Sequence, residues 1–132
     1  MTIQARALSE PWRVEYSADT VTGVADTLKN GMGGHAGFRP HELLKAAVAA
    51  CMTITARMCL ADRKLDDRGV TVTVDLIRDD DTSRFQYVLE LPARLESERQ
   101  MLMERLEHSP VRTTLSKNLT FEPRWHFVTS ES

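Results

Sequence analysis

The chain has 132 residues, which is long enough for one domain of ordinary size. It carries 17 Lys and Arg against 19 Asp and Glu, so the net charge is −2 at pH 7. This near balance gives no indication of nucleic acid or an anionic membrane surface as a partner. Residues 1–10 lack the apolar segment of a signal peptide, and no uncharged apolar run reaches the length of a membrane span. We therefore expect a single domain over residues 1–132, with no membrane and no nucleic acid among its partners.

Two strands are predicted near the N-terminus, over residues 12–16 and 20–28, because β-branched and aromatic side chains alternate there with polar ones. A turn over residues 17–19 would join them as a hairpin. Residues 30–38 hold four glycines, which predicts a flexible loop. We interpret His35 in this loop as a solvated side chain. The four histidines of the chain show no metal-ligand spacing, so neither a metal nor another cofactor is expected.

One long helix is predicted over residues 39–66. Pro40 suits the first helical position, where a missing N–H costs nothing, and Gly69 would end the helix. Apolar residues recur at helical spacing and widen into a face that covers almost the whole circumference, which is typical of a buried helix. The helix would be roughly 40 Å long at ~1.5 Å per residue. Because that exceeds what the core of a small monomer covers, a second chain is expected to cover part of it.

Both cysteines, Cys51 and Cys59, lie on this predicted helix. The helical rise between them is ~12 Å, whereas a disulfide needs Cα atoms within about 7 Å. We therefore expect two free thiols, which is consistent with a cytoplasmic protein. A lone cysteine on an apolar helical face is most often a small core hydrophobe, and from composition that is the first interpretation of Cys51.

The second half of the chain predicts a hairpin followed by two helices. Residues 70–76 and 85–91 alternate apolar with polar side chains, and a polar turn over residues 79–83 joins them. Ser97 and Gln100 form a capping box, which would start a helix that runs to about residue 108.

Ser109 at an N-cap and Pro110 at the first helical position then predict a short helix to about residue 117. Residues 119–121 and 124–128 predict a final strand, interrupted by Pro123. The expected order is β-β-α-β-β-α-α-β, an α+β fold in which a long central helix and a second helix pack on antiparallel sheets.

Two segments carry a family resemblance. Residues 40–51, PHELLKAAVAAC, resemble the Pro-x-(Glu/Asp)-Leu-Leu-x-Ala-Ala-x-Ala-Ala-Cys segment of the OsmC/Ohr superfamily, the osmotically inducible and organic hydroperoxide resistance proteins. Residues 108–115, HSPVRTTL, resemble the His-Cys-Pro-Val-x-x-Thr-Leu of that family. The two segments keep the order and roughly the spacing of the family, and the match covers nearly the whole chain.

The resemblance implies an intertwined homodimer, in which two long helices are wrapped by sheets that both chains build. It also implies a chemistry in which a thiol reduces organic hydroperoxides, with Cys51 at the peroxidatic position. Such a nucleophile has to be a thiolate, while a free thiol is mostly protonated at pH 7. Because Cys51 is in the middle of its helix, we expect a nearby cation rather than a helix N-terminus to stabilise the thiolate.

The sequence departs from the family at two positions. Ser109 stands where the family has its second cysteine, which resolves the sulfenic acid, and serine cannot form a disulfide. His41 stands where Ohr-type members carry the carboxylate that orients a reactive arginine. Glu42 follows it, but one residue turns a side chain by ~100° around the helix, so Glu42 does not simply replace that carboxylate.

The roles around Cys51 therefore stay open. His41 could act as a general acid or as the cation, or it could be a residue of the capping turn; with ~15 Å of helical rise to Cys51, it could reach a thiol only across the dimer. Arg39 and Arg13 are candidates for the reactive arginine, or solvated charges.

Two functions follow as hypotheses. In the first, the protein is a cytoplasmic thiol-dependent peroxidase of one-cysteine type, and an external thiol such as a dihydrolipoyl group or glutathione regenerates Cys51. In the second, it is not an enzyme and binds a small apolar or reactive ligand in the cleft of the dimer.

Overall fold

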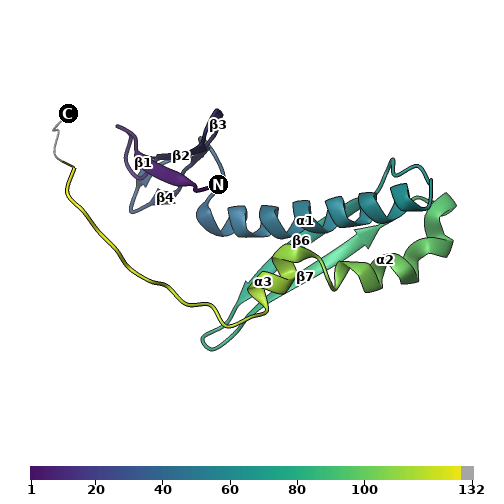
Figure 1. Ribbon diagram of the computed structural model, residues 1–132. Coiled ribbons are helices and arrows are strands. Elements are labelled where there is room, and N and C mark those ends of the chain that lie inside the picture. The colour runs from purple at the N-terminus through teal and green to yellow at the C-terminus, as the bar shows by residue number, and fades with distance from the viewer. Residues whose placement is uncertain (129–132) are drawn as a thin grey trace.

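The computed structural model describes residues 1–128 and confirms the α+β class. One long helix, α1, lies along a two-stranded hairpin, and a separate small sheet lies beyond the N-terminal end of α1 (Figure 1). The elements, in chain order, are β1 (Gln4–Ala7), β2 (Val14–Ala18), β3 (Val21–Ala25), β4 (Leu28–Lys29), β5 (Met32–Gly33), α1 (Pro40–Asp62), β6 (Thr71–Arg78), β7 (Ser83–Glu90), the 3₁₀ helix η1 (Ala93–Glu98), α2 (Arg99–Leu106) and α3 (Pro110–Leu115). All strand pairs in the named sheets are antiparallel.

The first sheet has one strand more than the sequence predicted. β1, β2 and β3 form it in that order, and β1 was missed because its side chains are all exposed and give no apolar alternation. The predicted strand over residues 20–28 ends at Ala25. Its last residue, Leu28, begins β4, which pairs with β5 inside the glycine-rich segment that we expected to be a loop throughout.

The long helix begins as predicted. Pro40 takes the first helical position, and the Glu42 carboxylate accepts a hydrogen bond of 2.9 Å from the backbone N–H of Arg39. This contact satisfies one of the orphan donors at the helix N-terminus.

The helix ends at Asp62, four residues before the predicted end. Lys64 adopts a φ of 58°, and the N–H groups of Lys64 and Leu65 each donate at 2.9 Å to carbonyls of the last turn. This is the Schellman arrangement, with a lysine in the position that glycine usually takes. Gly69, the expected breaker, instead has a φ of 88° in the turn before β6.

The core lies between α1, the hairpin and the C-terminal helices. One face of α1 is buried there with residues of β6, η1 and α2, namely Val48, Met52, Ala56, Leu60, Val72, Leu95, Leu102 and Leu106. The opposite face of α1 is open: Ile54 is 51% exposed and Met58 is 64% exposed. The sequence predicted that α1 is buried on nearly all sides, but within one chain only one face of the helix is buried. By length and composition alone α1 could span a membrane, a test that the core helix of a soluble protein also passes.

The C-terminal helices differ from the prediction at their boundaries. The predicted capping box is wrong, because η1 already runs from Ala93 to Glu98 and α2 follows it directly. Glu98 is buried and its carboxylate accepts a hydrogen bond from the Arg63 guanidinium, just after α1. α3 begins at Pro110 with Ser109 at its N-cap, as predicted.

The predicted final strand is also wrong. Residues 119–128 form no strand in the described chain, and they extend away from α3 (Figure 1). Phe121, Trp125 and Phe127 in this segment are each more than three-quarters exposed. A strand needs a neighbouring edge to bond to, and residues 119–128 pair with no strand in the described part of the chain.

Candidate functional site around Cys51

Cys51 lies at the boundary between the buried and open faces of α1. Its side chain is half-buried, and its Sγ accepts a hydrogen bond of 3.5 Å from the backbone N–H of Val111. Val111 is the second residue of α3, so the first turn of α3 packs against the sulfur. The sequence led us to expect no helix N-terminus here; a second helix, 60 residues further along the chain, provides one.

Ser109 lies at the start of the same turn. It is fully buried, and its hydroxyl has no hydrogen-bond partner among the described residues. Ser109 occupies the N-cap position of α3, as predicted, but its hydroxyl makes no capping hydrogen bond. The two segments that carry the family resemblance therefore meet in space at Cys51 and the first turn of α3.

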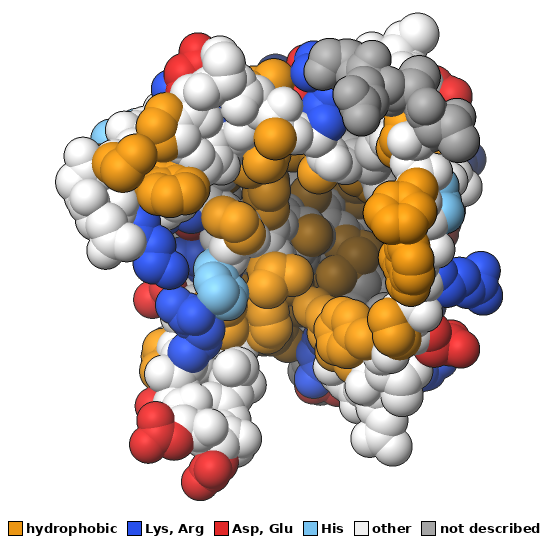
Figure 2. Space-filling model, turned by 90° about the vertical axis from the view of Figure 1, so that its left-hand side faces the viewer, with side chains coloured by type: hydrophobic (Ala, Val, Ile, Leu, Met, Phe, Trp, Pro, Cys, Tyr) orange, Lys and Arg blue, Asp and Glu red, His pale blue; other side chains and the backbone are white. Residues whose placement is uncertain are grey.

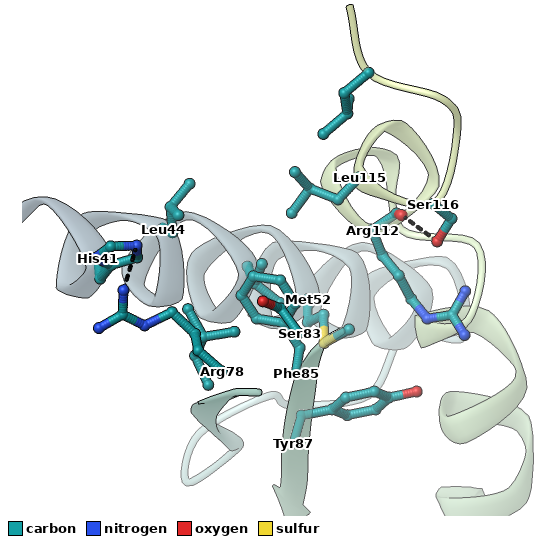
Figure 3. Close-up of a pocket in the computed structure, with 13 residues that line it drawn as sticks. His41, Leu44, Met52, Arg78, Ser83, Phe85, Tyr87, Arg112, Leu115 and Ser116 are labelled. Atoms are coloured by element: carbon teal, nitrogen blue, oxygen red, sulfur yellow. Dashed lines mark hydrogen bonds between the residues drawn. The ribbon is translucent and has the colours of Figure 1, made fainter. Parts of the chain in front are cut away.

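His41 does not face Cys51. Its Nε2 lies 3.2 Å from Nη1 of Arg78, at the end of β6 (Figure 3). His41 therefore contacts an arginine of β6 and not the thiol of its own chain.

Glu42 and Arg39 also lie away from the thiol. Glu42 caps the N-terminus of α1, and Arg39 is the residue before that helix. With ~1.5 Å of rise per residue, about 14 Å and 18 Å of helix separate them from Cys51. Within one chain neither can contact the sulfur.

Arg13, the other candidate arginine, belongs to a structural cluster in the N-terminal region. Its Nε donates at 3.1 Å to the buried carboxylate of Asp26. Asp26 also accepts hydrogen bonds from the backbone N–H groups of Ala36 and Thr27, at 3.0 Å and 2.9 Å. The bond from Ala36 is the main cause that lowers the pKa of Asp26 below its ordinary value, and it outweighs the effect of burial. Asp26 thus holds the glycine-rich segment next to the end of β3, and Arg13 is the cation paired with it.

An apolar pocket opens next to the Cys51 region, between α1, the hairpin and α3 (Figure 3). Its volume is about 450 Å³. The apolar lining is formed by Leu44, Val48, Met52, Leu76, Phe85 and Tyr87, and the His41–Arg78 pair lies at one end. Cys51 is not part of the lining, since its neighbour Met52 takes that place.

Sequence reasoning missed two residues of this region. Val111 gave no signal, because a backbone donor cannot be recognised from residue type. Arg78 did give one: β6 buries or half-buries Val72, Val74 and Leu76, and the same alternation puts Arg78 on the inward face. The predicted strand stopped at residue 76, so this inward charge was not noticed. No group of three or more His, Cys, Asp and Glu side chains in residues 1–128 could hold a metal ion.

Comparison with known proteins supports the resemblance read from the two segments. The family model of the OsmC-like proteins matches residues 18–124. A search of curated proteins gave no match.

Three solved structures share the fold. A candidate osmotic stress induced and detoxification response protein from Psychrobacter arcticus has a TM-score of 0.68 at 18% identity, over 86% of this chain and 87% of its own. The organic hydroperoxide resistance protein OsmC from Legionella pneumophila has a TM-score of 0.57 at 18% identity, over 89% of both chains. An OsmC-like protein of unknown function from Vibrio cholerae has a TM-score of 0.60 at 13% identity, over 87% of this chain and 92% of its own. The chain therefore belongs to the OsmC-like protein family.

Proposed function

We propose that this protein is a cytoplasmic organic hydroperoxide reductase of one-cysteine type, with Cys51 as the peroxidatic residue. The observation that carries the proposal is the meeting of the two family segments at the Cys51 sulfur, where the Val111 N–H donates to Sγ. This backbone N–H is a donor at the sulfur that would attack the peroxide. The name of the Legionella neighbour, an organic hydroperoxide resistance protein, agrees with this chemistry.

The reaction has two stages. The Cys51 thiolate attacks the terminal oxygen of the hydroperoxide, an S–O bond forms, the O–O bond breaks, and the alkoxide leaves as an alcohol after it takes up a proton. The product on the protein is a sulfenic acid. An external thiol then attacks the sulfenic sulfur and releases water, and a second thiol frees Cys51 and leaves as the disulfide of the reductant. Because residue 109 is a serine, the chain has no second cysteine at the family position for this step.

We also propose that the active form is a homodimer. The open face of α1 and the C-terminal segment both carry large apolar side chains that are more than half exposed, which is typical of a surface that a partner covers. A partner chain would cover the open face and could offer an edge to residues 119–128. The candidate residues that lie far from Cys51 in one chain, Arg39, His41 and Glu42, would approach a thiol only if that thiol belonged to the partner.

The test is peroxide consumption by the wild type and by Cys51→Ser, each with and without dihydrolipoamide. We expect turnover of cumene hydroperoxide only for the wild type with the dithiol, and a single equivalent consumed without it. Cys59→Ser is the matched control, because it removes the other thiol of the same helix, and it should keep the wild-type rate. Peroxide consumption at the background rate in every condition would refute the enzymatic proposal.

The second candidate function, binding of a small apolar ligand, has its own supporting observation. The pocket of about 450 Å³ lies within the range of ~300–1,000 Å³ that is usual for small-molecule sites, and Cys51 does not line it. A ligand could therefore occupy the pocket without meeting the thiol.

A further inference from the structure

Ser109 is a buried polar residue that the reaction described above does not use. Its side chain is fully buried, and its hydroxyl has no hydrogen-bond partner among the described residues. A hydroxyl that leaves water without gaining a hydrogen bond destabilises the folded chain. Buried polar groups are almost always paired in folded proteins, so an unpaired one beside a reactive residue calls for an explanation.

The first turn of α3 explains why the hydroxyl is unpaired. Ser109 is the N-cap of α3, and Val111 is the second residue of that helix. An N-cap serine ordinarily accepts a hydrogen bond from the backbone N–H of the second or third helical residue. Here the Val111 N–H donates to Sγ of Cys51 instead, at 3.5 Å. The Cys51 sulfur thus takes a donor that the Ser109 hydroxyl would ordinarily use, and both groups lie at the same turn.

Oxidation of Cys51 changes what this turn contains, because a sulfenic acid carries an oxygen on its sulfur. Sulfur is a weak hydrogen-bond acceptor, whereas oxygen is a good one and a charged oxygen is a strong one. A serine hydroxyl has one proton to donate, and no described residue accepts the proton of Ser109. The peroxidatic reaction therefore brings an acceptor to the turn that holds an unused donor.

From this arrangement we propose that the Ser109 hydroxyl donates a hydrogen bond to the sulfenic oxygen of oxidised Cys51 and thereby slows over-oxidation. In over-oxidation the sulfenate sulfur attacks the terminal oxygen of a second hydroperoxide. A second S–O bond forms, the O–O bond breaks, the alkoxide takes up a proton and leaves as an alcohol, and the product is a sulfinic acid. A hydrogen bond to the sulfenate oxygen draws electron density from the sulfur and makes it a weaker nucleophile. The inference rests on the proposed peroxidatic role of Cys51.

Such protection suits a chain that has serine at position 109. A second cysteine there would convert the sulfenic acid into a disulfide, whereas with serine the sulfenic acid has to wait for an external thiol. Cys51 meanwhile lies beside the apolar pocket, because its neighbour Met52 is part of the lining. Figure 2 shows a hollow on the surface that is lined with hydrophobic side chains. A second organic hydroperoxide in this region would compete with the external thiol for the sulfenic acid.

The test follows the two oxidations of Cys51 separately. The full chain is treated with excess cumene hydroperoxide without a reductant, and samples are quenched with dimedone, which traps sulfenic acids. Mass spectrometry of the Cys51 peptide gives the dimedone adduct and the sulfinic acid over time, and hence the rate of each oxidation. We expect Ser109→Ala to raise the rate of the second oxidation relative to the first roughly tenfold, as the loss of one hydrogen bond to a charged group allows. An unchanged ratio would overturn the inference.

Thr114→Ala is the matched control, because it removes an exposed hydroxyl from the same helix and should keep the wild-type ratio. An equal rise in both variants would show a general loosening of α3 and contradict a specific role for Ser109. Thermal unfolding adds a second readout. Because the Ser109 hydroxyl has no partner in the thiol form, Ser109→Ala should melt no lower than the wild type. A lower melting temperature would mean that the hydroxyl is already bonded before oxidation, against the inference.

The outcomes separate this inference from the proposed function. If the wild type gives the dimedone adduct of Cys51 and Ser109→Ala keeps the wild-type ratio, Cys51 is peroxidatic and the role assigned to Ser109 is wrong. If the wild type gives neither the adduct nor the sulfinic acid, the peroxidatic function fails and this inference fails with it.

Discussion

Cys51 and Ser109 show how far single residues could be assigned from sequence. The family segments pointed to both positions, and the structure brings the two segments together at the Cys51 sulfur. The roles of His41, Glu42 and Arg39 depend on what each side chain contacts, and those contacts come from distant parts of the chain. His41 meets Arg78, 37 residues away, which no local pattern specifies. Glu42 caps the N-terminus of α1 instead; a carboxylate three residues after an N-cap is a local signal for this, but this capping was not predicted from the sequence.

Ser109 provides a redox prediction at the residue scale. Its side chain is fully buried and its hydroxyl is unpaired, so a thiol would displace no hydrogen bond of the described chain. We expect Ser109→Cys, after mild treatment with cumene hydroperoxide, to form a disulfide between residues 51 and 109 within one chain.

Mass spectrometry of the digested protein without reductant measures that disulfide. The internal control is Cys59, which should not pair with Cys51, because the helical rise of ~12 Å keeps the two apart. Over-oxidised Cys51 with no 51–109 bridge would mean that the two positions do not face each other as required.

The elements were predictable wherever local signals decide them. The start of α1 follows from Pro40, and the hairpin follows from its alternation. The end of α1 was missed because Lys64, a residue with no particular preference for positive φ, makes the turn that glycine usually makes. The strand expected at residues 119–128 has the right side chains, but strand formation also needs a partner edge, which is a property of the assembly and not of the segment.

Asp26 gives a prediction for the N-terminal elements. Its carboxylate holds Ala36, Thr27 and Arg13 together, and these contacts lower its pKa from the ordinary value of 3.8. A lowered folded-state pKa contributes stability that is complete above the ordinary value and is lost as the pH falls through the folded-state value. Asp26→Asn should therefore lower the melting temperature at pH 7, and the difference from wild type should shrink as the pH falls below about 4.

Thermal unfolding followed by circular dichroism between pH 3 and 7 measures this difference. Glu10→Gln is the matched control, because Glu10 is the exposed carboxylate that pairs with the same Arg13, at 3.5 Å. An exposed pair contributes little, so this variant should stay close to wild type at every pH. A constant deficit of Asp26→Asn over the whole range would mean that the lost stability does not come from the ionised carboxylate.

At the scale of the whole molecule, the chain leaves two apolar surfaces open. One is the face of α1 that carries Ile54 and Met58, and the other is the C-terminal segment with Phe121, Trp125 and Phe127. The sequence predicted exposed apolar surface on α1, because the helix is long and apolar almost all round. The core of one small chain does not cover a helix of that length. Which of the two surfaces a partner chain would cover could not be predicted, because it depends on the arrangement of two copies.

The last prediction is the homodimer and the position of its interface. Light scattering at low micromolar concentration should give twice the chain mass of 14.9 kDa for the wild type. Ile54→Asp should give the mass of one chain, because a carboxylate enclosed in an apolar interface without a partner is strongly unfavourable. Val88→Asp is the matched control: Val88 is 58% exposed on the outward face of β7, so the same substitution there should leave a dimer. A wild type that is monomeric and unfolds cooperatively would rule out the dimer, and a dimeric Ile54→Asp that remains folded would place the interface elsewhere than on the open face of α1.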